Sequence, residues 1–436
     1  MKFKKIIMRN RILVFMMVMC FYGTVFSQET LSLSLEQAQG YALEHNRTLQ
    51  NASIDIKISE ASSWQTLATL LPQVSANVDY TNQFGYEVDF GGGVISMPNA
   101  IDYGGTASVT VSGAQVVGVQ LKKIAGEMAD VTLKKTEKDV KDQVKTLYYS
   151  ALVMEETLSL LEKNMDNLEQ LMVYTEQSVK VGVAEQTDAD LLSVQLSSMK
   201  TNVNSTRRSL EMIYNSMRLQ LGLDVNTEIE LNETIDELMN YNSCVSLLDN
   251  EFILANNYNF QLLEKNVLLA QKQINLKKWD YAPTLTAFYK YTGREYINAE
   301  GGLNFTPTNM FGLSLNIPIF SSFMRSAAVK EAKFNYQKQL NVFDDTREGL
   351  IIQHRQLSYN LSSAVENFET QKKNKVVVQR VFDNISKKYE QGVASSLDVT
   401  NSGSELIASQ SSYVQALLQM VTAQIELEKL LNIENN

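Results

Sequence analysis

The 436-residue chain has a formal net charge of −10 and contains only two histidines and two cysteines. An acidic protein repels the phosphate backbone, so nucleic acid is excluded as an expected partner. No Cys-x-x-Cys, His-Glu-x-x-His, Walker-loop or Gly-x-Ser-x-Gly motif occurs in the sequence. The composition therefore predicts a protein that is not an enzyme and that uses no cofactor or metal.

The first 27 residues have the three parts of a secretory signal peptide. A basic start is followed by an apolar run over residues 12–21 and by a small residue, Ser27, at the predicted cleavage point. The run is shorter than the roughly 20 residues that a membrane-spanning helix needs. Cys20 raises the alternative of a lipid anchor, but Met19 before it and the apolar residues after it argue against lipidation. Cleavage removes five basic residues and no acidic one, which changes the net charge from −10 to −15.

The two halves of the chain repeat each other. Asn46–Gln50 aligns with Asn257–Gln261 at an offset of 211 residues, and Gly182–Asp188 aligns with Gly392–Asp398 at an offset of 210. An offset that stays nearly constant over most of the chain predicts an internal duplication. We therefore expect a first structural repeat at 28–225, a linker at 226–245 and a second repeat at 246–436.

Each repeat starts with a helix that runs into a proline, Pro72 or Pro283, and continues as two strands. Strands are expected at about 73–90, 105–115, 284–296 and 309–318, where apolar and polar residues alternate. Phe288 interrupts the polar face of its strand. Alternation is also typical of an ordinary sheet with one buried face, so that alternative stays open. Because a bilayer tolerates no open strand edges, a membrane location would require several chains to combine.

Long helices follow the strands, since no proline lies between Pro98 and Pro283 or after Pro318. Apolar residues recur at alternating spacings of three and four, which predicts coiled-coil helical hairpins at about 118–222 and 323–433. His354 falls on the second hairpin's seam and is expected to pack there rather than bind a metal. The seam of the first returning helix is predicted at Ala189, Leu192, Leu196, Met199, Val203, Leu210, Ile213 and Met217.

A short turn separates the two helices of each hairpin. Gly182 and Gly392 can end the first helix in the left-handed conformation that other residues avoid. Thr187, Asp188 and Asp398 follow, where a side-chain oxygen can cap the next helix. Capping alone would account for these residues, so a functional role needs further support.

In this order, the motifs resemble the TolC-like outer-membrane efflux proteins. The resemblance rests on the duplication, the Leu71-Pro72 and Ala282-Pro283 entries, Asn316-Ile-Pro-Ile-Phe320 and the two Gly-Val-Ala turns, and it covers nearly the whole mature chain. It implies a mixed α/β membrane protein that forms a homotrimer. Three chains of four strands each would give a twelve-stranded β-barrel in the outer membrane, above a twelve-helix α-barrel in the periplasm. A periplasmic adaptor protein, an inner-membrane transporter and outer-membrane lipid are the implied partners.

The resemblance also implies a gate and an adaptor contact at the turns. The gate positions match Thr187, Asp188, Tyr389, Asp398 and Asn401, and the adaptor contacts match Gly182, Val183, Gly392 and Val393. Asp188 and Tyr389 are the expected hydrogen-bonded pair, whereas the family's latch arginine falls at Ala394. A second aspartate of the family falls at Asn401. A ring of Asp398 carboxylates at the aperture would favour cations.

Two functions of different classes fit the sequence. The preferred one is a passive outer-membrane exit channel for efflux or type I secretion, gated at the periplasmic helix turns. The alternative is a periplasmic coiled-coil tether or scaffold whose short sheet is a soluble cap. Both functions suit long heptads and negative charge. The paired strands with polar loops, and the prolines at the helix–strand junctions, favour the channel.

Overall fold

The computed structural model describes residues 30–89, 91–235, 241–297 and 308–433. The predicted signal peptide, with Cys20, lies outside the described residues. Two compact units make up the described chain: unit 1 holds residues 30–45 and 147–235, and unit 2 holds the others. These units do not coincide with the sequence repeats, because helix α4 (Gly113–Lys180) begins in unit 2 and ends in unit 1.

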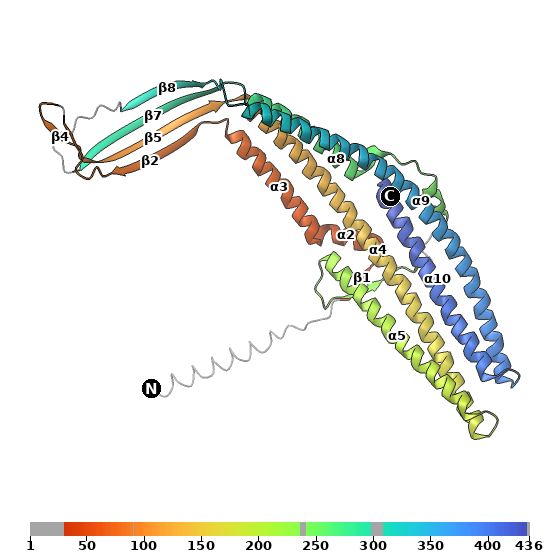
Figure 1. Cartoon of the computed structure of the whole chain (residues 1–436). Coiled ribbons are helices and arrows are strands. Elements are labelled where there is room, and N and C mark those ends of the chain that lie inside the picture. The colour runs from red at the N-terminus through yellow and green to blue at the C-terminus, as the bar shows by residue number, and fades with distance from the viewer. Residues whose placement is uncertain (1–29, 90, 236–240, 298–307, 434–436) are drawn as a thin grey trace, which may run out of the picture. The chain divides into compact units, whose positions relative to one another are not determined.

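Unit 2 contains a four-stranded antiparallel sheet in the order β2-β5-β7-β8, and Figure 1 shows the four strands side by side. The strands are β2 (Gln73–Thr81), β5 (Asn99–Val111), β7 (Thr284–Ile297) and β8 (Asn309–Asn316). A separate hairpin of β3 (Glu87–Asp89) and β4 (Val94–Ser96) lies between β2 and β5 in the sequence. Both repeats contribute two neighbouring strands, and β2 and β8 form the two edges of the sheet.

The strand register places apolar residues on one face and polar residues on the other. Val78, Tyr103 and Gly293 are paired across three strands, and Leu285 and Leu315 are paired on the same face. This apolar face is exposed in the chain; its exposed members include Val74, Val78, Tyr80, Leu285, Tyr289, Phe311, Leu313 and Leu315. The alternative of an ordinary sheet with one buried face is therefore wrong for the described part of this chain.

Two strands of the first repeat differ from their predicted ranges. β2 ends at Thr81, well before residue 90, because the chain turns at Phe84, whose φ of 49° is incompatible with a strand. β5 begins at Asn99 and ends at Val111 rather than spanning 105–115. It ends there because the Ser112 hydroxyl accepts a hydrogen bond from Gln115 N–H (3.3 Å) and so starts helix α4.

Helices continue unit 2 beyond the sheet. Those of the first repeat are α3 (Arg47–Ala68) and the first part of α4; the others are α7 (Tyr241–Leu248), the 3₁₀ turn η1 (Leu254–Asn256), α8 (Tyr258–Trp279), α9 (Met324–Glu390) and α10 (Ser396–Leu431). The aligned residues Asn46 and Asn257 both cap a helix, because each side-chain oxygen accepts two backbone N–H groups. α9 and α10 bury a seam that includes Leu361, Phe368 and Leu406. His354 lies half-buried against the Phe252 ring, at 5.1 Å between centroids, and burial lowers its pKa.

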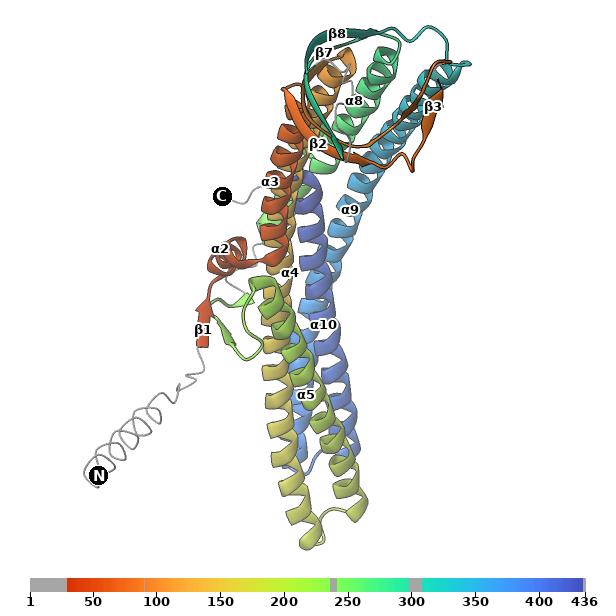
Figure 2. The same ribbon diagram turned by 90° about the vertical axis from the view of Figure 1, so that its left-hand side faces the viewer.

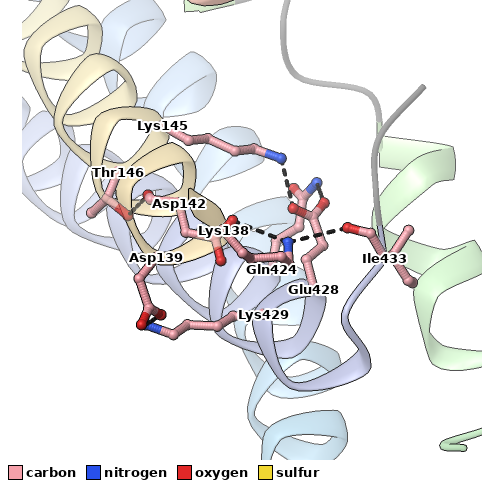
Figure 3. Close-up of polar contacts among 9 residues, drawn as sticks. All are labelled: Lys138, Asp139, Asp142, Lys145, Thr146, Gln424, Glu428, Lys429 and Ile433. Carbon is pink, nitrogen blue, oxygen red and sulfur yellow. Dashed lines mark hydrogen bonds and ion pairs between the residues drawn. The ribbon is translucent and has the colours of Figure 1, made fainter. Parts of the chain in front are cut away.

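Buried charges join α4 to α10 inside unit 2, as Figure 3 shows. The Lys145 ammonium lies 2.6 Å from the Glu428 carboxylate, and both side chains are buried. Gln424 donates to the other oxygen of Glu428 (2.8 Å) and accepts from the Cys244 thiol (3.0 Å). Lys138 pairs with Asp142 (3.2 Å), whose pKa is raised by burial. This network connects the first repeat to the second.

Unit 1 consists of a short parallel sheet, helix α2 (Leu35–His45), the second part of α4 and helix α5 (Gln186–Leu221). β1 (Thr30–Leu33) pairs in parallel with β6 (Glu228–Leu231), which lies in the segment predicted as a linker. α4 and α5 run side by side to the turn that joins them (Figure 2). Ion pairs link the two helices, for example Arg207 with Glu162 (2.7 Å). The predicted α5 seam is buried at Ala189, Leu192, Leu196, Met199, Val203 and Met217.

No helix among the described residues has an apolar stretch long enough to cross a bilayer.

Candidate functional site

The candidate functional residues lie in two helix turns, and each unit contains one of these turns. In the α4–α5 turn, Gly182 N–H bonds to Val179 C=O (3.0 Å) and Val183 N–H to Ser178 C=O (2.8 Å). This pair of bonds is the Schellman motif, which satisfies the last carbonyls of a helix. It requires a left-handed residue, and Gly182 supplies it with a φ of 78°.

The α9–α10 turn has the same geometry. Gly392 N–H bonds to Tyr389 C=O (2.9 Å) and Val393 N–H to Lys388 C=O (2.8 Å), with a φ of 73° at Gly392. The duplication is thus visible at the level of single backbone bonds. It also explains the presence of glycine at both positions, since other residues rarely adopt this conformation.

Each returning helix then begins with an acidic residue in its first turn. The Asp188 carboxylate accepts from Glu185 N–H (3.1 Å), and the Thr187 hydroxyl donates to the Glu185 carboxylate (3.2 Å). The Asp398 carboxylate accepts from Ser395 N–H (3.0 Å) and from the Ser395 hydroxyl (2.7 Å). Hydrogen bonds from the Ser395 backbone and side chain lower the pKa of Asp398 below its ordinary value.

The capping roles differ in one respect from the prediction. Asp188 and Asp398 do not stand at the N-cap; Glu185 and Ser395 do, and the aspartates lie three residues later. They complete a reciprocal capping box by accepting the backbone N–H of the N-cap residue. In α10, the Ser-x-x-Asp spacing of Ser395 and Asp398 is the sequence pattern that could have predicted the capping box.

The tips of both turns present apolar side chains to solvent. Val181, Val183 and Val393 are all exposed, and a Cβ added at Gly182 or Gly392 would meet nothing within 4 Å. Aliphatic side chains at the end of a long hairpin are costly in water.

The other residues at the predicted gate positions differ in their exposure to solvent. Tyr389 is buried, Asn401 is exposed, and Ala394 is half-buried. The predicted bond between Asp188 and Tyr389 would join unit 1 to unit 2, and it stays a prediction. Sequence reasoning also missed the buried Lys145–Glu428 pair, because its two residues lie far apart in the sequence and on different helices.

The polar face of the sheet is a second feature of functional interest. Arg294 makes a bidentate pair with Asp102 across β5 and β7, at 2.5 and 2.9 Å. Thr110 and Thr286 share a hydrogen bond (2.9 Å) on the same face. One face of the sheet therefore carries polar groups that bond to one another, while the other face is apolar and exposed.

A family model described as outer membrane efflux protein matches residues 40–223 and 251–432, one match for each repeat. The chain belongs to the outer membrane efflux protein family. Outer membrane protein TolC of Escherichia coli (strain K12) is 22% identical over 427 residues, which cover 94% of this chain and 84% of that protein. Members of this family are transport proteins rather than enzymes, and this one is an outer-membrane channel that extends into the periplasm.

Solved structures agree on the fold. The Campylobacter jejuni CmeC outer membrane channel superposes with a TM-score of 0.74 at 13% identity, covering 91% of this chain and 85% of that one. The open state of the Neisseria gonorrhoeae MtrE outer membrane channel gives 0.73 at 16% identity, with 94% and 93% covered. The efflux protein therefore has the TolC-like fold of antiparallel strands, long helical hairpins and duplicated halves.

Proposed function

We propose that this efflux protein is the passive exit duct of a tripartite efflux or type I secretion assembly, and that it works as a homotrimer. The observation that carries the proposal is the sheet of unit 2, which has one exposed apolar face and two edges, β2 and β8, that no other described strand covers. An open sheet edge is not tolerated in a bilayer, so β2 and β8 need partners from other chains. Three copies of the four-stranded sheet would close a barrel of twelve strands.

In this barrel the apolar face meets lipid and the polar face lines a water-filled lumen. Leu313, Leu315 and Val78 would face acyl chains. Asp102 and Arg294 would face water, where a charged pair costs little. The long hairpins would then form the periplasmic tunnel. We prefer a channel to a soluble tether because the family match and the exposed apolar face both favour it.

The turns would bind a periplasmic adaptor protein, and an inner-membrane transporter would supply the energy. Gly182, Val183, Gly392 and Val393 are the proposed adaptor contacts, supported by their exposure at the hairpin tips. Aliphatic tips favour an adaptor surface that is itself apolar, because such a contact removes both surfaces from water.

The gate would lie at the same end. Asp188 and Tyr389 would hold the two hairpins together, with Thr187 beside them, while Ala394 removes one latch that the family uses. Three Asp398 carboxylates would ring the aperture and favour cations. The capping bonds from Ser395 support this role, since they favour the charged form of each carboxylate. Asn401, an amide in place of a second acid, leaves this ring with a lower charge.

Single-channel conductance in a planar bilayer tests the proposal, with wild type compared with Asp188→Ala/Tyr389→Phe. We expect a small wild-type conductance that increases in the double variant, because the link between the hairpins is lost. A large conductance in both would refute the Asp188–Tyr389 latch but keep the duct. Failure of the folded protein to form channels would contradict the duct itself. Asp398→Asn is expected to reduce cation selectivity, and unchanged selectivity would refute the carboxylate ring.

A further inference from the structure

The segment between the sheet and the longest helix of the second repeat is unusually apolar and exposed. We call residues Ile317–Met324, which follow β8 and end at the first residue of α9, the junction loop. Its exposed side chains are Ile317 (55%), Ile319 (91%), Phe320 (75%), Phe323 (78%) and Met324 (68%). Residues 308–324 contain no Asp, Glu, Lys or Arg. Five large apolar groups in one short connection form a patch that water does not favour.

The backbone of the junction loop is held in a strained shape. Ser322 and Phe323 both have positive φ, 48° and 66°, a conformation that costs about 1–2 kcal/mol for a residue with a side chain. The rings of Phe320 and Phe323 are exposed and lie edge to face, with 6.1 Å between centroids.

The buried side chain of Arg325 is bonded to the junction loop. Arg325 donates from Nε to the Ser321 hydroxyl (2.9 Å) and from Nη1 to the Pro318 carbonyl (2.7 Å). Its guanidinium also lies over the Tyr281 ring, 5.2 Å from the centroid. These contacts fasten Pro318 and Ser321 to the first turn of α9, while the apolar side chains of the loop stay exposed.

The junction loop continues the apolar face of the sheet. The last residue pair of the β7–β8 ladder is Thr284 with Asn316, and Leu313 and Leu315 precede it on the apolar face. Ile317 follows in the same alternation, one residue beyond the end of the ladder. Since the apolar face is the lipid-facing side of the proposed barrel, the loop lies on that same side, where the strands give way to periplasmic helices.

We propose that the junction loop inserts into the periplasmic leaflet of the outer membrane, at the boundary between phospholipid headgroups and acyl chains. Aromatic side chains are favoured at this boundary, where one side is wet and the other apolar. Arg325 is the positioning residue that holds the loop in the inserting shape. The inference rests on the proposed barrel, because it takes the lipid-facing side from it.

Depth-dependent fluorescence quenching tests the proposal on the full chain in phosphatidylcholine vesicles. The sequence has only two tryptophans, Trp64 and Trp279, so Trp64→Phe/Trp279→Phe gives a dark background. Single tryptophans are then introduced by Phe320→Trp in the loop, Leu313→Trp on the apolar face of β8, and Phe334→Trp. Phe334 is an exposed residue of α9 about 15 Å beyond the loop along the helix and serves as the matched control. The vesicles contain lipid brominated either near the headgroup or near the middle of the acyl chain.

We expect the Phe320→Trp emission to be lost mainly with bromine near the headgroup, and the Phe334→Trp emission to be unaffected by either lipid. Adding Arg325→Met should reduce the quenching of Phe320→Trp, because the loop is no longer held outward. If Leu313→Trp is quenched by lipid while Phe320→Trp is quenched only by aqueous acrylamide, the barrel stands and the loop proposal fails. Protection of Phe320→Trp from both quenchers would show that another protein chain covers the loop, which also overturns it. Absence of lipid quenching at Leu313→Trp would mean that the proposed barrel itself is wrong.

Discussion

Replacing Glu428 with leucine should destabilise the contact between α4 and α10 far more than replacing both members of its ion pair. The Lys145 and Glu428 side chains are each 7% exposed, with 2.6 Å between the ammonium nitrogen and the carboxylate oxygen. Glu428→Leu leaves the Lys145 ammonium buried without its carboxylate. Breaking a buried pair from one side costs about 3–5 kcal/mol, because the remaining charge is neither hydrated nor compensated.

The double variant Lys145→Met/Glu428→Leu separates the charge effect from packing. It removes both charges and keeps apolar side chains of similar volume, a change that is often neutral or stabilising. A second control is the exposed pair Arg207–Glu162 in unit 1, with side chains 59% and 40% exposed. Glu162→Gln is expected to cost at most about 1 kcal/mol, because water screens an exposed pair.

Hydrogen–deuterium exchange read by mass spectrometry is the suitable assay, since it reports local opening in a large protein. Peptides that cover the last turns of α10 should exchange roughly a hundredfold to several thousandfold faster in Glu428→Leu, the equivalent of about 3–5 kcal/mol. The double variant should stay within about tenfold of wild type. Equal acceleration in the single and double variants would refute the reasoning, because it would show that packing, and not the buried charge, determines the stability there.

The turns give three further predictions, all measured by exchange of peptides that span residues 391–402. Gly392→Ala should cost about 1–2 kcal/mol, since alanine is strained at a φ of 73°; no acceleration would show that the left-handed conformation is not required. Ser395→Ala should cost about 1 kcal/mol through loss of the N-cap. Because hydrogen bonds lower the pKa of Asp398 below its ordinary value of 3.8, its contribution is present above that value and is lost as pH falls through the lowered pKa. Asp398→Asn should abolish this pH dependence, and an unchanged dependence would assign it to another group.

The sheet and the hairpins could be predicted because their causes are local in the sequence. Period-two alternation gave the faces of β2 and β7, and three–four spacing gave the α5 seam, because each pattern reflects the geometry of one element. The ends of the elements could not be predicted as well. β2 stops where Phe84 takes a positive φ, and β5 stops where Ser112 caps α4, and both events depend on a single residue's backbone or side chain.

What the sequence could not show is pairing between distant residues. The strand β6 is short, and it forms only because β1, almost 200 residues earlier, lies parallel to it. The same limit applies to the buried network, since nothing in α4 marks Lys145 as the partner of Glu428. At the turns, the sequence identified the capping residues but assigned some of them the wrong role. Asp398 was predicted to cap α10 itself, whereas Ser395 is the N-cap and Asp398 bonds back to it.

The buried network also shows how the two repeats have diverged. Glu428 lies 210 residues after Arg218, the offset at which the two turns align, so the two residues occupy the same position with opposite charge. Arg218 bonds to Glu211 (2.7 Å) and to the Thr227 carbonyl (2.6 Å) within unit 1. At the same offset, the counterpart of Lys145 is Arg355. The counterparts of the two paired residues, Arg355 and Arg218, are therefore both arginines and could not form an ion pair with each other. The described ion pair therefore joins the long helix of the first repeat, α4, to the returning helix of the second, α10, and the charges at the exchanged positions would repel each other.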